Sequence, residues 1–507
     1  MGFAMQPKRL PEKGPALQRT GLDRQSGTRN KQLERRVAAL ARAGLEVAFE
    51  AGVYRVRLAG NAHEPPAEVL LPEGFPLEGK ALRQLAQLAA ARHPAGGHAR
   101  RVCASPDFHP GDAGVAIGSI VECDGMVIPA AVGSDINCGM RLHVVDLDVD
   151  RFVRKRDALV EALKGDYFFG TRDLPMTAAA MRGLFHEGLL GWSEAVRRER
   201  LGLLARVDLD AIEGELERVQ LDGSLGGNAR WAPSDLVPQQ GVVRDGGLAT
   251  IGGGNHFVEV QVVDAVVDRA RAYAWGVREG QIAFMVHSGS RHVGKHVGAY
   301  WHDQARSLWP SGERHPESAL FGLSLADRPE AVAAYLEAEA TAANYGFLNR
   351  LLLAELMRFR LREVHGQIEA PLVYDLPHNL TWSVAGQPRR WVTRKGACPA
   401  AEGQPVIIPG SMGAVSFLLV GRGHERFLAS ASHGAGRARS RFSMGRRAAS
   451  EEELGLVGVD CITLRGERRI EEAPAAYKPI EPVIDCQVEA GLVDVVARLR
   501  PVLTFKS

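Results

Sequence analysis

The first part of the chain alternates short apolar runs with glycine and proline, a pattern that is typical of strands separated by turns. One longer amphipathic stretch, Gly79–Arg92, has helical spacing and predicts a helix. The predicted strands are Glu46–Leu58, Val115–Cys123, Met126–Ile128 and Arg141–Asp146.

The pattern changes between residues 167 and 245. Acidic and basic residues recur at helical spacing over Thr177–Gln220, and a segment rich in Gly, Asn and Pro follows over Asp222–Gln240. We therefore expect a helical insertion over residues 167–245.

Strand-like runs resume at Ala249–Val263 and Gln281–His287. A long helical region is expected over Leu325–Gly366, with an interruption near Ala343–Gly346, and glycine-punctuated strands fill the last third. Strands and helices alternate without a regular rhythm, and no internal repeat is visible. The prediction is an α+β protein: one large catalytic body of mixed sheets with flanking helices, interrupted by the insertion.

The N-terminus is basic. Residues 1–36 contain nine Lys or Arg and three Asp or Glu, and they predict a flexible arm that leads into a helix near Leu33–Ala43. The catalytic domain is then expected over residues 37–507. Such an arm could contact RNA or acidic lipid, although most arms of this kind are only solvated extensions.

Composition excludes several classes of protein. Of the 507 residues 45% are hydrophobic and 24% are charged, which is typical of a globular chain and not of a disordered, collagen-like or disulfide-stapled one. The net charge of +2 means that any affinity for nucleic acid must come from local patches. Six cysteines without a C-x-x-C pair, no signal peptide and no apolar span indicate a cytoplasmic protein that does not enter a membrane. A monomer is the default.

Five residues could ligate metal. Asp135 and Cys138 are three apart in a glycine-flanked turn, and His256, His287 and His378 lie at the ends of predicted strands. A carboxylate, a thiolate and three imidazoles suit transition metals, and five ligands fit two ions that share a bridge better than one tetrahedral ion. Each residue alone has an ordinary structural alternative, such as a buried cysteine or a hydrogen-bonded core histidine.

A second candidate site follows at His433-Gly434-Ala435-Gly436, where small residues let backbone N–H groups approach an anion. No acidic residue occurs from Ala431 to Arg447. The arginines of this segment are Arg437, Arg439, Arg441, Arg446 and Arg447. The segment predicts either a phosphate site or a solvated loop, and His433 is a candidate nucleophile toward phosphorus.

Six motifs in order carry a resemblance to a known family. They are Gly133-Ser-Asp-Ile-Asn-Cys-Gly139, Gly254-Asn-His-Phe-Val-Glu259, His287-Ser-Gly-Ser-Arg291, Arg394-Lys-Gly-Ala397, Pro409-Gly-Ser-Met-Gly413 and His433-Gly-Ala-Gly-Arg437. The chain resembles the RtcB family of RNA ligases, which depend on GTP and manganese and are also called tRNA-splicing ligases. The resemblance covers roughly residues 100 to 507 apart from the insertion.

The resemblance implies a role for each matching position. Metal ligation falls on the five residues above, with Cys138 bridging two Mn²⁺ ions, although ligand softness alone would favour Zn²⁺. His433 would be the guanylylated nucleophile, with Asp107 and Arg437 beside it in the active centre. The residues implied in nucleotide binding are Asn255, Phe257, Glu259, Arg291, Ser411, Ser416, Gly434, Ala435, Gly436, Tyr477 and Lys506.

The implied activity joins an RNA 3′-phosphate or 2′,3′-cyclic phosphate end to a 5′-hydroxyl end through a His–GMP intermediate, in tRNA splicing or RNA repair. The partners would be RNA with such ends and, in some members, an activator of the archease type. The alternative is a metal-dependent RNA phosphoesterase or cyclic phosphodiesterase that does not ligate and needs neither GTP nor His433.

Overall fold

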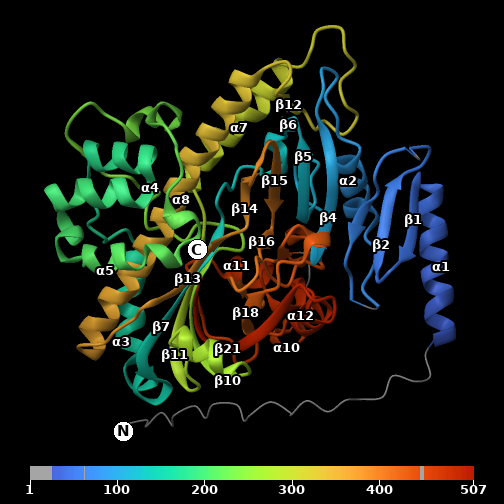
Figure 1. Cartoon of the computed structure of the whole chain (residues 1–507). Coiled ribbons are helices and arrows are strands. Elements are labelled where there is room, and N and C mark those ends of the chain that lie inside the picture. The colour runs from blue at the N-terminus through green and yellow to red at the C-terminus, as the bar shows by residue number, and fades with distance from the viewer. Residues whose placement is uncertain (1–25, 62, 73, 446–449) are drawn as a thin grey trace.

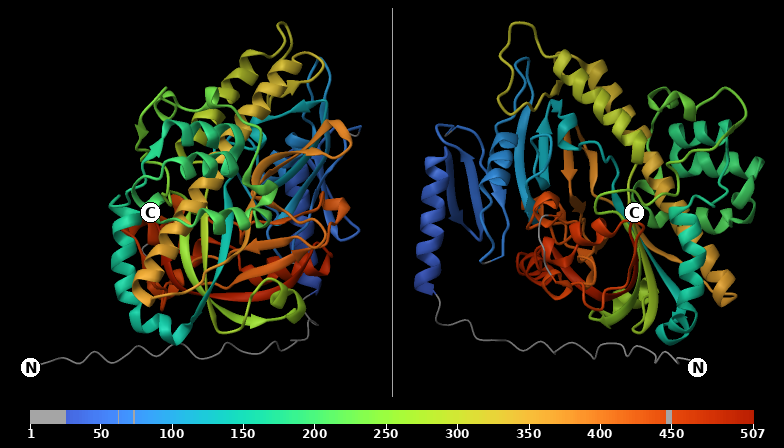
Figure 2. Two further views of the ribbon diagram at one scale, coloured as in Figure 1. Left: turned by 60° about the vertical axis from the view of Figure 1, so that its left-hand side comes forward. Right: turned by 180° about the vertical axis from the view of Figure 1, so that it is seen from behind.

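The computed structural model describes residues 26–61, 63–72, 74–445 and 450–507. Two large sheets and several helices form the body, with α1 (Ser26–Arg42) at one side and the helices of the 167–245 region at the other (Figures 1 and 2). The predicted α+β class with mixed sheets is confirmed.

The first sheet has seven strands in the order β1-β2-β3-β4-β5-β15-β14. Its strands are β1 (Leu45–Glu50), β2 (Val53–Leu58), β3 (Ala67–Val69), β4 (His98–His109), β5 (Ile117–Asp124), β14 (Asn379–Val384) and β15 (Gln387–Lys395). The run predicted as one strand over Glu46–Leu58 is a hairpin, because Ala51 and Gly52 have φ of 49° and 80° and turn the chain back. The last two strands in this order come from the C-terminal half of the chain. The sheet is therefore completed by the long-range pairing of β15 with β5.

The second sheet has the order β13-β7-β11-β10-β21-β18-β17, and β20 pairs with β21. Its strands are β7 (Gly139–Asp148), β10 (Phe257–Val266), β11 (Gln281–Ser288), β13 (Leu372–Pro377), β17 (Pro405–Ile408), β18 (Ser416–Gly421), β20 (Cys461–Ile462) and β21 (Val493–Phe505). The small pairs are β6 (Met126–Val127) with β12 (Leu323–Ser324), β8 (Met176–Thr177) with β9 (Val242–Val243), and β16 (Ala397–Pro399) with β19 (Ser430–Ser432).

Strand β10 begins later than expected. The prediction placed a strand over Ala249–Val263, but the chain is irregular until Phe257. Ala249, Gly252 and Gly254 have φ of 52°, 88° and 82°, in the left-handed region, and three such residues within six positions prevent a continuous strand. The apolar residues of this segment therefore belong to a buried loop that leads into the strand.

Helix α8 (Pro329–His365) is the central helix of the molecule and packs against α3, α4, α7 and strands β7 and β11. The interruption predicted near Ala343–Gly346 is wrong, because the helix runs through it without a break. Gly346 is there for close packing: a Cβ at this position would lie 3.1 Å from the backbone oxygen of Asn137. The glycine thus lets the loop before β7 lie directly on the helix.

The helical character predicted for residues 167–245 is confirmed by α4 (Ala178–Arg198), α5 (Leu209–Gly214) and several short 3₁₀ turns. Thr177 caps α4 by accepting a hydrogen bond from the backbone N–H of Ala180 at 3.0 Å. Asn344 on α8 binds the backbone of Leu225 in both directions, at 2.9 and 2.8 Å, and ties this region to the body. Figures 1 and 2 show these green helices beside α8.

The remaining helices lie at the surface or between the sheets. They are α2 (Gly79–Ala89), α3 (Val149–Phe168), α6 (Arg269–Ala274), α7 (Arg291–Ser307), α9 (Arg441–Gly445), α10 (Glu451–Leu454), α11 (Gly466–Glu471) and α12 (Ile480–Glu489). Helix α1 begins at Ser26 and not at the expected Leu33, and the first 25 residues of the expected arm lie outside the described residues. None of the helices in the described part of the chain is long and apolar enough to cross a membrane. All six cysteines are free.

Candidate active site

The five predicted metal ligands meet at one end of the second sheet. Asp135 and Cys138 precede β7, His256 precedes β10, His287 lies on β11 and His378 follows β13. Because β13, β7, β11 and β10 are neighbours in that order, the sheet brings these segments side by side. The register fixes the alignment, with Ser288 opposite Gly139 and Pro377 opposite the same glycine on the other side.

Cys138 is the centre of the group. Its Sγ lies 3.2 Å from Nε2 of His256 and 3.2 Å from Nε2 of His287, and Nε2 of His256 lies 2.9 Å from Oδ2 of Asp135. The ring of His378 follows, with its centroid 5.2 Å from that of His287. All five residues predicted from the sequence are therefore neighbours in space.

This donor set fits a metal centre. The ligand atoms of Cys138, His256 and His287 lie within 4.8 Å of one another and are buried. Burial, together with the Asp135 carboxylate, raises the pKa of the Cys138 thiol well above its usual range, so a thiolate here needs a cation to compensate its charge. Burial and the neighbouring histidines lower the pKa of His287 and His378, which keeps both rings neutral and able to ligate.

His433 stands next to this group. It follows β19, and its ring centroid lies 4.8 Å from that of His378. Its Nδ1 lies 2.6 Å from Oδ2 of Asp107, and the same oxygen accepts the His433 backbone N–H at 3.1 Å. Nε2 is the ring nitrogen left for a substrate, and the side chain is 14% exposed.

Asp107 is fully buried on β4, and its other oxygen accepts a hydrogen bond from the Ser105 hydroxyl at 2.7 Å. Burial opposes ionisation, but the His433 ring and the hydrogen bonds outweigh it and lower the Asp107 pKa to about 2. An ionised Asp107 keeps the proton of His433 on Nδ1. Gly436 is required beside this pair, because a Cβ there would lie 2.0 Å from the Asp107 carbonyl oxygen and its φ is 73°.

One cleft connects the two groups. It encloses about 860 Å³ of space, open to solvent, and Asp135, Cys138, His378 and His433 line it together with Lys395. Lys395 belongs to the Arg394-Lys-Gly-Ala397 motif but was not among the predicted site residues. Its ammonium donates to the Ala130 carbonyl at 3.3 Å, and burial lowers its pKa to about 8.

Several of the predicted nucleotide-binding residues form a second cluster around Glu259. This buried carboxylate accepts hydrogen bonds from Thr504 at 2.6 Å and Gln261 at 2.7 Å, and Gln261 also donates to Ser416 at 2.9 Å. Burial raises the Glu259 pKa to about 7, against the opposing effects of these bonds and of Lys506.

Lys506 connects this cluster to the cleft. Its ammonium donates to Oδ1 of Asn255 at 3.3 Å and lies 5.9 Å from the centre of the Phe257 ring. That ring packs in the core against His287, so Phe257 has only its backbone to offer a nucleotide. Asn255 also lines the cleft beside His256. Ser411 is half-buried in the turn between β17 and β18.

Arg437 does not point its charge into the cleft. Its guanidinium makes four hydrogen bonds to protein groups, which are Glu472, the Tyr477 hydroxyl and the carbonyls of Arg439 and Glu471. Glu472 also accepts from Arg441 at 2.7 Å and from the Tyr477 hydroxyl. In the structure Arg437 therefore holds Tyr477. Glu472 was missed from the sequence, because an isolated glutamate carries no local signal of its burial.

The remaining predicted positions follow the cleft residues His287 and His433 closely in the chain. Arg291 starts α7 with φ of 54°, and its Nε donates to Thr250 at 3.1 Å. Gly434, Ala435 and Gly436 follow His433 directly, and the Gly436 carbonyl accepts the Lys478 backbone N–H at 2.9 Å. Two arginines of the basic run, Arg446 and Arg447, lie outside the described residues.

Comparison with known proteins gives a consistent result. The model of the family described as tRNA-splicing ligase RtcB matches residues 84–507. A protein of Mycobacterium bovis named RNA-splicing ligase RtcB is 35% identical over 440 residues, which cover 80% of this chain and 96% of that protein. Proteins named tRNA-splicing ligase RtcB are 32% identical in Pyrobaculum aerophilum, over 79% of this chain and 86% of that protein, and 33% identical in Archaeoglobus fulgidus, over 78% and 85%.

Proposed function

This chain belongs to the RtcB family of tRNA-splicing ligases, and from that premise we propose that it is a GTP-dependent RNA ligase. The reaction joins an RNA 3′-phosphate, free or formed from a 2′,3′-cyclic phosphate, to the 5′-hydroxyl of a second RNA end. One GTP is consumed for each joint, and GMP and pyrophosphate are released. The observation that carries the proposal is the buried Asp107–His433 pair, which opens onto the same cleft as the Cys138 group.

In the first step Nε2 of His433 attacks the α-phosphorus of GTP. An N–P bond forms, the bond to the bridging oxygen breaks, and pyrophosphate leaves with the electron pair. The ring gains positive charge as the bond forms, and the ionised Asp107 at 2.6 Å from Nδ1 stabilises that charge. His433 must be neutral at Nε2 to react, and the hydrogen bond to Asp107 keeps its proton on the other nitrogen.

In the second step an oxygen of the RNA 3′-phosphate attacks the GMP phosphorus, and the N–P bond breaks to return His433 to its free form. In the third step the 5′-hydroxyl oxygen attacks the activated 3′-phosphate, loses its proton and expels GMP. The buried cation Lys395 lines the cleft between His433 and the 133–135 loop. We place the RNA phosphate near this ammonium, because it brings positive charge to the wall of the cleft that His433 also lines.

Asp135, Cys138, His256, His287 and His378 would hold two Mn²⁺ ions. Bound metal would supply positive charge beside the reacting phosphates, which otherwise repel a nucleophile. This assignment is supported by the central position of Cys138, whose Sγ lies 3.2 Å from Nε2 of both His256 and His287.

The guanine would lie over the Glu259 cluster. An ionised Glu259 can accept from the base N1–H and N2–H₂ groups, and Lys506 can donate to O6. Tyr477, held by Arg437 and Glu472, offers its ring for stacking. Asn255, which lines the cleft and accepts from Lys506, and Ser416, which accepts from Gln261, would contact the ribose and phosphates.

The test is covalent labelling with α-³²P-GTP and Mn²⁺. A phosphoramidate is stable in alkali and labile in acid, so the protein should keep its label in the first and lose it in the second, and His433→Ala should take none. A fully metallated wild-type protein that never becomes labelled would refute the proposal. Cyclic phosphodiesterase activity that survives His433→Ala without GTP would instead identify a phosphoesterase.

A further inference from the structure

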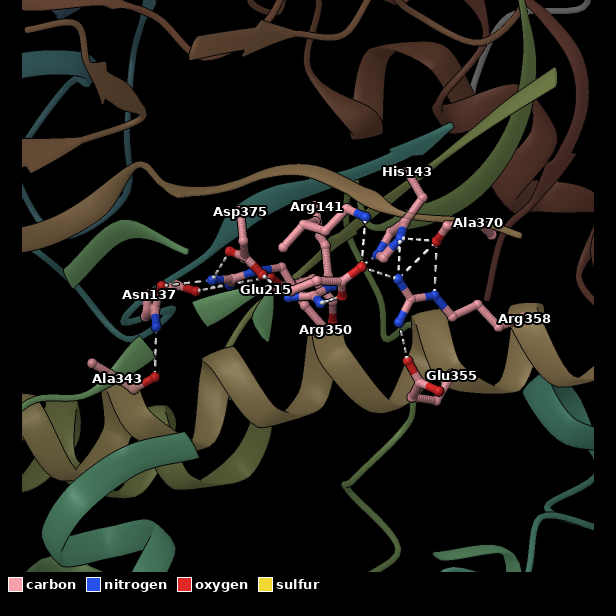
Figure 3. A network of polar contacts seen from close by, with 12 residues as sticks. Asn137, Arg141, His143, Glu215, Ala343, Arg350, Glu355, Arg358, Ala370 and Asp375 are labelled. Atoms are coloured by element: carbon pink, nitrogen blue, oxygen red, sulfur yellow. Dashed lines mark hydrogen bonds and ion pairs between the residues drawn. The ribbon is translucent and has the colours of Figure 1, made fainter. Parts of the chain in front are cut away.

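Arg350 is a fully buried arginine on α8, directly behind the loop that carries Asp135 and Cys138. It has no contact with the cleft and was given no role above. Figure 3 shows it within a buried polar network between α8 and the second sheet, with Asn137 and Asp375 beside it.

The guanidinium reaches three different segments. Nη1 donates to the Asn137 carbonyl at 2.5 Å and to the Ser288 carbonyl at 3.1 Å, and Nη2 donates to the Asn137 side-chain oxygen at 3.0 Å. Nε and Nη2 both donate to Oδ1 of Asp375, at 3.0 and 2.7 Å. All three nitrogens are therefore engaged in fixed directions.

Each of these segments carries predicted metal ligands. Asn137 lies between Asp135 and Cys138, Ser288 follows His287 on β11, and Asp375 precedes His378 on the strand β13. One planar group thus links the backbone positions of four of the five ligands. The fifth ligand, His256, is held separately. Its Nδ1 lies within hydrogen-bond distance of the Ile251 carbonyl oxygen, at 3.1 Å.

The residues around the Arg350 guanidinium are tightly packed. A Cβ at Gly139 would lie 3.0 Å from Cζ of Arg350 and 2.6 Å from the Leu376 carbonyl oxygen. Asn137 has φ of 53° and donates through its side chain to the Ala343 carbonyl of α8 at 2.5 Å. The ligand loop is therefore attached to the helix at two points, the Ala343 carbonyl and the Arg350 guanidinium.

Asp375 supplies the negative charge beside Arg350 and also accepts from Arg141 at 3.2 Å. The other N–H groups of the buried guanidinium need acceptors as well. The additional bonds to Asn137 and Ser288 go to backbone and amide oxygens that belong to the ligand segments. This distribution is what a group that orients ligands requires.

We propose that Arg350 is a positioning residue of the metal centre, which sets metal affinity by fixing the loop of Asp135 and Cys138 against the ends of β11 and β13. The inference rests on the proposed function only in treating the Cys138 group as a metal site. A lysine cannot replace the arginine, because a single ammonium cannot span a fork of bonds to three segments.

The test compares Arg350→Lys with Arg358→Lys as the matched control. Arg358 lies on the same helix and is 6% exposed. Its guanidinium is equally engaged, by Glu355, Glu215 and the Ala370 carbonyl, but touches none of the ligand segments (Figure 3). Both variants keep their charge, and melting temperature reports on any loss of folding that they share.

Each protein is stripped of metal and titrated with Co²⁺, and the thiolate-to-cobalt charge-transfer absorption reports binding at Cys138. We expect Arg350→Lys to weaken Co²⁺ binding by about 10- to 100-fold and to reduce the charge-transfer intensity. Arg358→Lys should bind Co²⁺ as the wild type does, even if both variants melt earlier.

Wild-type cobalt affinity in a folded Arg350→Lys, or an equal loss in both variants, overturns the inference and leaves the proposed function intact. A wild-type protein that shows no thiolate–cobalt absorption overturns the metal site itself. If Arg350→Lys fails to fold while Arg358→Lys folds, Asn137→Ala provides the same readout. It removes the side-chain bonds to Arg350 and Ala343, and an unchanged Co²⁺ affinity in that variant overturns the inference.

Discussion

Asp107→Asn is expected to slow the guanylylation of His433 without affecting metal binding. The structure gives the magnitude, because the surroundings of Asp107 lower its pKa from 3.8 to about 2 despite complete burial. That difference corresponds to about 2.4 kcal/mol, or roughly 60-fold, in favour of the ionised carboxylate. Because burial acts in the opposite direction, the stabilisation of the carboxylate by attraction to the His433 ring and by its hydrogen bonds, including the one from Ser105, exceeds this net value.

The same attraction stabilises the positive charge that develops on His433 when Nε2 binds phosphorus. An asparagine of the same shape loses it and can also stabilise the wrong tautomer by donating to Nδ1. We therefore expect the rate to fall by up to roughly 60-fold, and by up to roughly 10⁴-fold if the tautomer changes. The assay is single-turnover labelling at saturating GTP, with Ser105→Ala as the control that removes the 2.7 Å bond to Asp107 but keeps its charge. Ser105→Ala should lose only a few-fold. Labelling of Asp107→Asn at the wild-type rate, with Co²⁺ binding unchanged, would show that the carboxylate does not assist the nucleophile.

Three further outcomes follow from the structure. Burial raises the pKa of Glu259 to about 7, and Glu259 must be ionised to accept from guanine. GTP affinity measured by calorimetry should therefore fall as the pH drops below about 7, and this pH dependence should be lost in Glu259→Gln. Chelation should abolish labelling and Mn²⁺ should restore it, whereas Cys138→Ser should need far more Mn²⁺; full labelling after exhaustive chelation would contradict a metal role. Gly436→Ala should lower the melting temperature and slow labelling, because its Cβ would lie 2.0 Å from the Asp107 carbonyl oxygen at a φ of 73°. A melting temperature equal to that of the wild type would count against this packing.

The candidate site was predictable where its chemistry is local. A cysteine and an aspartate in one glycine-flanked turn, and histidines at the ends of apolar runs, are visible in the order of residues, and the structure brings all five together. The helix α2 and the strands β5, β7 and β11 were likewise predictable from local periodicity, with small errors at their ends. These features depend on interactions between residues that are close in the chain.

The errors arose where a distant partner decides the conformation. Ala343–Gly346 looks like a helix break, but the glycine is needed because the Asn137 loop packs on the helix there. The contact of Arg437 with the buried Glu472 was not predictable either, because the two residues are 35 positions apart in the chain. Arg350 has no signal of its own in the sequence, because its partners Asn137 and Asp375 are far from it in the chain and reach it only through the folded sheet.

The position of the ligands in the topology explains why the site depends on contacts between distant parts of the chain. His378 is the single residue between β13 of the second sheet and β14 of the first, and the segment of Asp135 and Cys138 lies where the chain leaves the first sheet after β5 and enters the second at β7. Asp107 belongs to the first sheet, on β4. The ligands and the nucleophile pair therefore come into register only when the two sheets have docked, and α8 with Arg350 holds the crossing loops against the second sheet. A site built at such crossings cannot form in either sheet alone, so its chemistry is a property of the assembled body and not of any one motif.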